Sequence, residues 1–262
     1  IAWLLALGQD SDIGAPQPQP TRDGAFFVTE SDPPGLPLPL RCIVFDWKPG
    51  VRLGLRFNKE NLHAMGQLFA RLHQHALRFK PPKDFTRLKM DSPYVRGAGE
   101  VLFDKHFRPH FSAANHKIFT RVHQRVKNTY AALYADSKGL RVIHHDLYHD
   151  NISVHRGQLY PFDFEDTVWG YPIQDIATAM RDLLEDTPAT DYMPLRQSFR
   201  AGYESLESWP ERHDGELDTL VAAHFIESVN RTAHSDPGSL AQKILSTAPL
   251  LNKLLATGIT AK

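Results

Sequence analysis

The sequence is poor in cysteine and has no long apolar run. Cys42 is the only cysteine among the 262 residues, so no disulfide can form within the chain, which suits a reducing compartment. No stretch approaches the length of a membrane-spanning helix, and the chain does not open with the charged and then apolar segment of a signal peptide. We therefore expect a cytoplasmic protein with no membrane partner.

The sequence also lacks a net charge. Lys plus Arg and Asp plus Glu each number 30, so the formal net charge at pH 7 is zero. No excess of positive charge is available to recruit nucleic acid, which makes a nucleic-acid partner unexpected. With 42% hydrophobic residues, the chain can fill one large domain or two lobes, while its oligomeric state stays open.

Helical periodicity dominates the chain beyond residue 58. Asn58 is a residue type that caps helices, and apolar residues recur after it at helical spacing as far as about Leu77. On this helix, His63, His73 and His75 are expected to be solvated or to cap rather than to bind zinc. Residues 80–108 show no sustained period and indicate an irregular excursion. Further helices are expected at residues 112–135, 173–186, 191–207, 215–234 and 238–257.

The first 50 residues predict a helix and a hairpin. The apolar face of residues 1–7 indicates a helix that stops near Gly8. Residues 24–29 and 41–47 predict two strands joined by a Pro-rich turn at residues 33–39. Because no N-cap precedes the helix, we expect the chain to begin inside a domain and the natural protein to extend further upstream.

Residues 140–180 gather the polar side chains that can do chemistry. The apolar pair before His144 delivers Asp146 into a loop that closes at Asn151. Residues 152–154 and 159–162 then predict a hairpin, which returns Asp163 to the neighbourhood of that loop. Two carboxylates and an amide would meet there, supplying oxygen ligands for Mg²⁺ and a carboxylate that can accept a proton.

The pattern His144-x-Asp146-x-x-x-x-Asn151, with Asp163-Phe164-Glu165 twelve residues further on, resembles a known family. It is similar to the catalytic core of the aminoglycoside phosphotransferase and choline kinase group of small-molecule kinases, which includes homoserine-kinase-like relatives. The likeness continues through Asp166, Trp169-Gly170 and Asp175-Ile176-Ala177.

The resemblance implies an α+β, protein-kinase-like fold with two lobes. Residues 1–50 would be the remainder of a truncated N-terminal lobe together with the hinge between the lobes. Residues 51–262 would form a mainly helical C-terminal catalytic lobe.

The resemblance also implies roles for individual residues. Asp146 would be the catalytic base or would orient the substrate hydroxyl, while Asn151 and Asp163 would hold Mg²⁺. His144 and Asp175 would support the loop structurally.

The hinge residues Phe45, Asp46 and Trp47 would hold the adenine of ATP, although a core strand ending in a Pro-Gly turn fits the same residues. Around the phosphate acceptor, Glu165 and Asp166 are equally consistent with substrate contacts and with solvated charges. Tyr148 and Trp169 could line the acceptor site or pack beneath the loop.

Three histidines near the loop, His145, His149 and His155, invite a zinc site. We do not expect one, because the chain offers no second cluster of ligands and its one cysteine is far upstream.

The function implied is an ATP- and Mg²⁺-dependent kinase acting on a hydroxyl of an amino alcohol, amino acid, aminoglycoside or sugar. The Gly-rich loop and strand lysine of such kinases do not occur, since the first lysine is Lys48 in the hinge. We therefore expect the chain as given to be an incomplete enzyme. A non-catalytic nucleotide-binding module and a protein-serine kinase of the same family are the alternatives. Acidic residues such as Asp182 would suit a cationic acceptor, whereas Arg181 and Arg196 would suit a carboxylate.

Overall fold

Helices make up most of the structure. The computed structural model describes residues 1–31, 40–97 and 99–261. The α-helices in these residues are α1 (Ala2–Asp10), α2 (Lys59–Arg78), α3 (Ala113–Leu133), α4 (Pro172–Asp186), α5 (Ala189–Glu204), α6 (Glu216–Ser235) and α7 (Leu240–Thr257). Short 3-10 turns are η1 (Leu53–Arg56), η2 (Lys105–His110), η3 (His149–Asn151), η4 (Phe164–Asp166) and η5 (Pro237–Ser239). In this part of the chain, no helix combines the length and the apolar character needed to cross a membrane.

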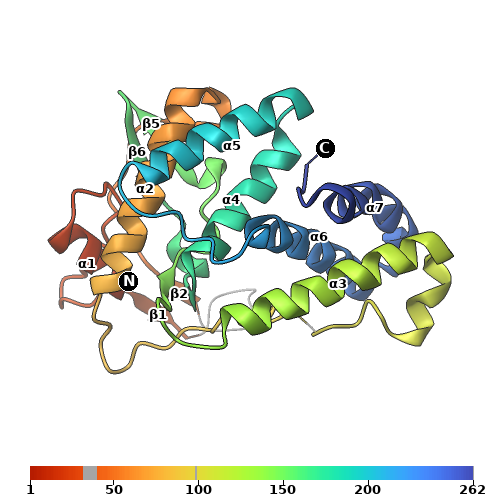
Figure 1. The fold of residues 1–262 in the computed structure, drawn as a ribbon. Helices are drawn as coiled ribbons and strands as arrows, with labels where there is room; N and C mark the ends of the chain where they lie inside the picture. The colour runs from red at the N-terminus through yellow and green to blue at the C-terminus, as the bar shows by residue number, and fades with distance from the viewer. Residues whose placement is uncertain (32–39, 98, 262) are drawn as a thin grey trace.

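Helix α2 begins where the sequence predicts. The Asn58 side chain accepts the backbone N–H of Asn61 at 2.7 Å, which satisfies one of the free donors of the first turn. The apolar face of α2 packs along α5, and Figure 1 shows the two helices side by side. Gly66 and Gly202 allow this approach, because a Cβ on either one would overlap the backbone of the facing helix. Helices α3, α6 and α7 pack together at the other end of the molecule.

The strands in the described part of the chain form three small antiparallel sheets. They are β1 (Val28–Glu30) with β2 (Leu40–Cys42), β3 (Val51–Arg52) with β5 (Ile152–His155) and β6 (Gln158–Pro161), and β4 (Arg141–Ile143) with β7 (Val168–Gly170). The predicted hairpin is confirmed as β5–β6, with His155 opposite Gln158. Arg156 and Gly157 between them have φ values of 51° and 79°, as a tight turn with the twist of a hairpin requires.

The bounds predicted for the helix and strands of the amino-terminal residues agree less well with the structure. Helix α1 continues to Asp10, past the predicted stop near Gly8, and ends where the Ser11 hydroxyl donates to the Leu7 carbonyl at 2.7 Å. The strands β1 and β2 pair as predicted but each covers only part of the predicted range. The predicted turn at residues 33–39 lies outside the described residues. Phe45, at the end of the second predicted strand, forms an isolated bridge with Pro18.

The fold is α+β and mainly helical, as the sequence predicts. One large hydrophobic core runs through the helices and reaches the β5–β6 hairpin through Ile152 and Leu159. This hairpin and the loop between β4 and β5 therefore rest on a packed base.

Candidate active site

His144 ties the loop after β4 to the end of the β5–β6 hairpin. Its side chain is fully buried. The Asp146 N–H donates to His144 Nδ1 at 3.3 Å, so Nε2 carries the ring proton and donates to the Phe162 carbonyl at 3.0 Å. The next residue, His145, has a φ of 65°, which turns the chain sharply ahead of Asp146.

Asp175, in the first turn of α4, holds the same loop through its backbone. It accepts the N–H groups of His144 at 3.2 Å and of His145 at 2.6 Å. His73 Nε2 lies 3.1 Å from Asp175 Oδ2, and His73 Nδ1 lies 3.1 Å from the Tyr203 hydroxyl. Burial alone would raise the pKa of Asp175, but the hydrogen bonds from His73 and the loop hold it below its ordinary value. Burial lowers the pKa of His73, so a neutral imidazole donates to an ionised carboxylate.

Sequence reasoning missed His73, and the expectation that His73 and His75 are solvated is wrong. Both are buried, and His75 Nδ1 accepts the Trp3 indole N–H at 3.1 Å. The sequence held one signal of this burial. His73 shares the apolar face of α2 with Phe69 and Ala76, where a solvated side chain has no room.

Asp146 is a half-buried carboxylate whose position is set by Asn151. The Asn151 amide Nδ2 donates both to the Asp146 backbone carbonyl and to Asp146 Oδ2, each at 2.8 Å. Burial, and after it the negative charges of Asp166 and Asp163, raise the pKa of Asp146 to about 6, against the hydrogen bond from Asn151. At neutral pH this carboxylate is ionised and close to the point at which it takes up a proton.

Asp163 and Asn151 are brought to one place by a backbone hydrogen bond. The Phe162 N–H donates to the Asn151 carbonyl at 3.0 Å, which fixes the end of β6 against the loop. Asp163 follows in the left-handed conformation, with a φ of 64° and a ψ of 58°, and its side chain is exposed.

The oxygens of these two residues suit Mg²⁺ but are too few for a metal ion that takes all of its ligands from the protein. Both Asn151 donors are directed to Asp146, so Asn151 Oδ1 would be the atom of this side chain able to bind a metal ion, together with the exposed Asp163 carboxylate. Within the described ranges, no three His, Cys, Asp or Glu side chains group so as to hold a metal. Mg²⁺ commonly takes only one or two protein oxygens when phosphate oxygens complete its shell.

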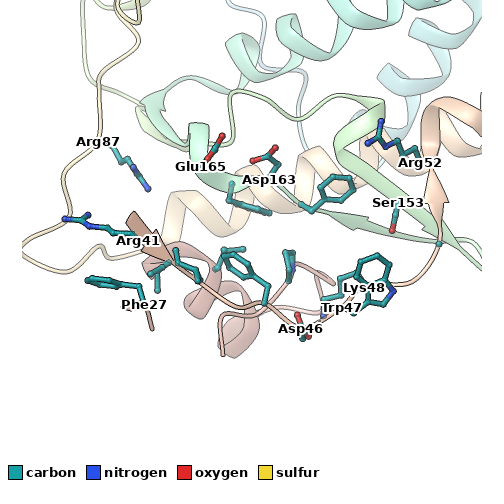
Figure 2. Close-up of a pocket in the computed structure, with 18 residues that line it drawn as sticks. Phe27, Arg41, Asp46, Trp47, Lys48, Arg52, Arg87, Ser153, Asp163 and Glu165 are labelled. Atoms are coloured by element: carbon teal, nitrogen blue, oxygen red, sulfur yellow. Dashed lines mark hydrogen bonds and ion pairs between the residues drawn. The ribbon is translucent and has the colours of Figure 1, made fainter. Parts of the chain in front are cut away.

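A cavity of about 1000 Å³ lies between this hairpin and the amino-terminal segments. Figure 2 shows Asp163 and Glu165 on one side of it and the segment with Asp46, Trp47 and Lys48 on the other. Phe45 also lines the cavity, so the residues predicted to hold adenine face the same space as Asp163.

Asp46 itself is engaged with its neighbours. Its N–H donates to the Gln17 carbonyl at 3.0 Å, and its carboxylate accepts from the Gln17 N–H at 2.6 Å and from Lys48 Nζ at 2.8 Å. Trp47 is 89% exposed, and Phe45 is also exposed. The aromatic surfaces of this segment are therefore available, whereas the N–H and the carboxylate of Asp46 are already engaged.

Glu165 and Asp166 have different surroundings. Glu165 is exposed and lines the cavity. The Asp166 carboxylate forms an ion pair with Arg96, whose guanidinium also donates to the Asp166 backbone carbonyl. Asp166 is thus already bound to a cation from the excursion between α2 and α3.

Tyr148 and Trp169 also have different surroundings. Burial and the charges of Asp146 and Asp182 raise the pKa of Tyr148, so its hydroxyl lies in the field of the carboxylate that would act as base. Trp169 belongs to β7, and its ring packs edge-on against Phe85 with centroids 5.9 Å apart. Trp169 is therefore a packing residue, whereas the Tyr148 ring packs edge-on against His149, with centroids 5.3 Å apart.

The charged residues of α4 and α5 differ in how they are paired. Arg196 makes two hydrogen bonds to Asp218, at 2.8 and 2.7 Å, and this pair is largely buried. Arg181 contacts Asp182 Oδ1 at 3.2 Å and Glu185 at 2.9 Å. Asp182 Oδ2 is buried and finds no hydrogen-bond partner among the described residues. Burial raises the pKa of Asp182 to about 7, against the charge of Arg181.

The three loop histidines lie in separate environments. The His145 ring lies 6.2 Å from the His224 ring, and His149 Nε2 pairs with Asp186 at 3.0 Å. His155 is the last residue of β5.

The chain is similar to known phosphotransferases. A family model described as the phosphotransferase enzyme family (APH) matches residues 25–213, which include the whole loop and hairpin. No curated protein matches the chain.

Solved structures of small-molecule kinases share the fold. A microcompartment-associated aminopropanol kinase is 21% identical, with a TM-score of 0.75 over 98% of this chain and 81% of that chain. An amicoumacin kinase solved with AMP-PNP and Ca²⁺ is 17% identical, with a TM-score of 0.70 over 94% and 75%. An aminoglycoside phosphotransferase from Alicyclobacillus acidocaldarius is 14% identical, with a TM-score of 0.61 over 98% and 81%. The kinase-like α+β fold expected from the sequence is confirmed.

Proposed function

This chain belongs to the phosphotransferase enzyme family, and from that premise we propose that it is an ATP- and Mg²⁺-dependent kinase acting on a small-molecule hydroxyl. The observation that carries the proposal is the pair Asp146 and Asn151. The amide of Asn151 fixes the Asp146 carboxylate at 2.8 Å, within the loop that β6 and Asp163 adjoin.

Asp146 is proposed as the group that orients the acceptor hydroxyl and takes up its proton. A general base works best with a pKa close to the operating pH, because it must be ionised and still attract a proton. Its pKa of about 6 meets both conditions near neutral pH. His144 and Asp175 act at a distance, by holding the backbone that leads to this carboxylate, from His144 to the N–H of Asp146.

Asn151 Oδ1 and Asp163 are proposed as the protein ligands of Mg²⁺. The bound ion would offset the negative charge of the nucleotide phosphates. It would also offset part of the charge that Asp163 places near Asp146, which would lower the pKa of Asp146 in the loaded enzyme.

The cavity is proposed as the nucleotide site. Phe45 and Trp47 offer exposed aromatic surface to a flat adenine ring, and the opposite side of the cavity carries Asp163. The engaged N–H and carboxylate of Asp46 give that residue a supporting role in this segment.

The acceptor is proposed to carry a positively charged nitrogen beside its hydroxyl, as an amino alcohol or aminoglycoside does. Arg196, one of the two arginines that could bind a carboxylate, is bound to Asp218. Asp182 has a buried oxygen without a partner among the described residues, and its charge acts on Tyr148 as that of Asp146 acts on Asp182. A buried carboxylate of this kind favours a cationic ligand.

A non-catalytic nucleotide-binding module is the second candidate. One observation favours it: Lys48 lines the cavity, but its Nζ is bound to Asp46 at 2.8 Å and so is not free to hold phosphate.

The test is the rate of Mg²⁺-dependent ADP release from ATP with a panel of amino alcohols, aminoglycosides, hydroxy amino acids and sugars. We expect turnover with a cationic acceptor and a loss of about a hundredfold or more in Asp146→Ala, the effect of removing a general base. Asp191→Ala removes an exposed carboxylate of α5 and should keep wild-type turnover. In wild type, kcat/KM should fall as the pH drops through the pKa of Asp146, which is about 6 in the empty protein and lower once Mg²⁺ is bound, because protonated Asp146 cannot accept a proton.

Binding of ATP without turnover for any acceptor would favour the binding module. Full activity in Asp146→Ala would remove Asp146 from the mechanism. A chain that binds no ATP at all would refute the proposed function.

A further inference from the structure

The excursion between α2 and α3 is attached to the segment that follows Asp163. The Trp169 N–H donates to the Leu88 carbonyl at 2.8 Å, and the Met90 N–H donates to the Trp169 carbonyl at 2.8 Å. Residues 88–90 thus lie alongside β7 as a short parallel bridge. The Phe85 ring packs against Trp169 on the other side of residue 87. These contacts hold the backbone of Arg87 in a defined position.

Arg87 extends into the cavity that also contains Asp163 and Glu165. It lines that cavity although it comes from a part of the sequence far from both. Figure 2 shows Arg87 and Arg41 at the end of the cavity near Glu165, away from the end that holds Trp47 and Lys48. The phosphate end of a nucleotide whose base lies at Trp47 would point in this direction.

The cations that line the cavity are not equally available. Lys48 is bound to Asp46 at 2.8 Å, and Arg52 lies 3.5 Å from Asp150. The Arg41 guanidinium lies over the Phe27 ring, 5.5 Å from its centroid, and forms no ion pair with any described residue. Arg87 has no carboxylate within ion-pair distance in the part of the chain that the structure describes. Two guanidinium groups therefore face this end of the cavity without an anionic partner among the residues that the structure describes.

We propose that Arg87, with Arg41 beside it, binds the phosphate oxygens of the nucleoside triphosphate. The proposal rests on the proposed function, since it assumes a nucleotide in this cavity. A guanidinium is planar, always charged and able to direct two N–H groups at one phosphate, so it is suited to this anion. Asp163 and Glu165 line the same cavity and would repel a bare triphosphate. Positive groups are therefore needed there to offset that repulsion.

This gives the excursion a function. Its hydrogen bonds to Trp169 connect the position of Arg87 to β7, and β7 begins directly after the Asp163–Asp166 segment. The cation that binds phosphate and the carboxylate that binds metal are thus fixed to the same strand connection.

The test compares the affinities of wild type, Arg87→Gln and Arg41→Gln for ATP, ADP and adenosine by titration calorimetry. Arg87→Gln should bind ATP and ADP about tenfold to a hundredfold more weakly, the effect of losing a hydrogen bond to a charged group, and should bind adenosine as wild type does. Arg87→Lys should recover part of the affinity. Arg78→Gln, at the exposed end of α2 and outside the cavity, controls for the loss of one positive charge.

The outcomes separate this proposal from the kinase itself. Unchanged ATP binding in Arg87→Gln, or an equal loss for ATP and adenosine, would overturn the phosphate contact while leaving the kinase intact. A wild-type protein that binds ATP without turnover would still test Arg87 through these affinities. A wild-type protein that binds neither ATP nor adenosine would overturn the proposed function and this inference together.

Discussion

Replacing Asp182 by Asn should make the protein more stable at neutral and alkaline pH. Asp182 is 8% exposed, one of its oxygens has no hydrogen-bond partner among the described residues, and burial raises its pKa from 3.8 to about 7. A carboxyl group with a raised pKa in the folded state favours folding when protonated. This contribution is complete below pH 3.8 and is lost as the pH rises to about 7.

The size of the effect follows from the shift. A difference of about 3 pKa units, at about 1.36 kcal/mol for each unit, corresponds to roughly 4 kcal/mol of stability lost once Asp182 is ionised. Asn has nearly the shape of the protonated acid and carries no charge. The free energy of unfolding of Asp182→Asn should therefore match that of wild type near pH 4. It should exceed it by up to about 4 kcal/mol at pH 8, with a slope of about 1.4 kcal/mol for each pH unit in between.

Urea denaturation of both proteins between pH 4 and pH 8.5 measures this difference directly. Asp84→Asn, an exposed carboxylate, controls for the loss of one negative charge. Asp182→Asn should also bind a cationic acceptor more weakly than wild type, since the carboxylate that destabilises the fold is proposed to bind that ligand. A stability difference that does not change with pH would refute the argument, because it would mean that Asp182 ionises as it does in the unfolded chain.

Two further predictions concern the packing that supports the site. His73→Phe should lower the free energy of unfolding by about 3 kcal/mol in urea denaturation, because the buried Asp175 carboxylate loses its imidazole partner; a loss below 1 kcal/mol would show that Asp175 does not depend on it. Gly202→Ala should cost about 3 kcal/mol by overpacking α2 against α5, whereas Gly238→Ala, whose Cβ would meet its nearest atom at 3.5 Å, should be almost neutral; equal effects of the two changes would contradict the close packing at Gly202.

Features encoded by neighbouring residues could be read from the sequence. The start of α2 follows from Asn58 and the apolar spacing after it, and the β5–β6 turn follows from Arg156-Gly157 between two apolar runs. The core pattern of Asp146, Asn151 and Asp163 is equally local, since a hairpin is enough to join its parts. Such elements depend on contacts within a few residues along the chain.

Contacts between distant residues could not be read in this way. His73 and Asp175 are 102 residues apart in the sequence, and nothing near either one announces the other. The attachment of residues 88–90 to β7 is hidden for a similar reason, because Leu88 and Met90 contribute only backbone groups, which every residue carries. The excursion therefore looked irregular although part of it is fixed.

For the same reason, the sequence shows which charged residues could belong to a site but not which of them are free to bind a ligand. Asp46, Asp166 and Arg196 look from the sequence like groups that could meet a ligand, yet the structure binds them to Lys48, Arg96 and Asp218. Asp182 and Arg87 are of the same chemical types, and the structure leaves an oxygen of one and the charge of the other without a partner in the residues it describes. A charged group already neutralised inside the fold gains little from a ligand, while an uncompensated one gains the full interaction. The proposed binding preferences, a cation beside Asp146 and phosphate beside Asp163, therefore rest on which charges are left unpaired among the described residues.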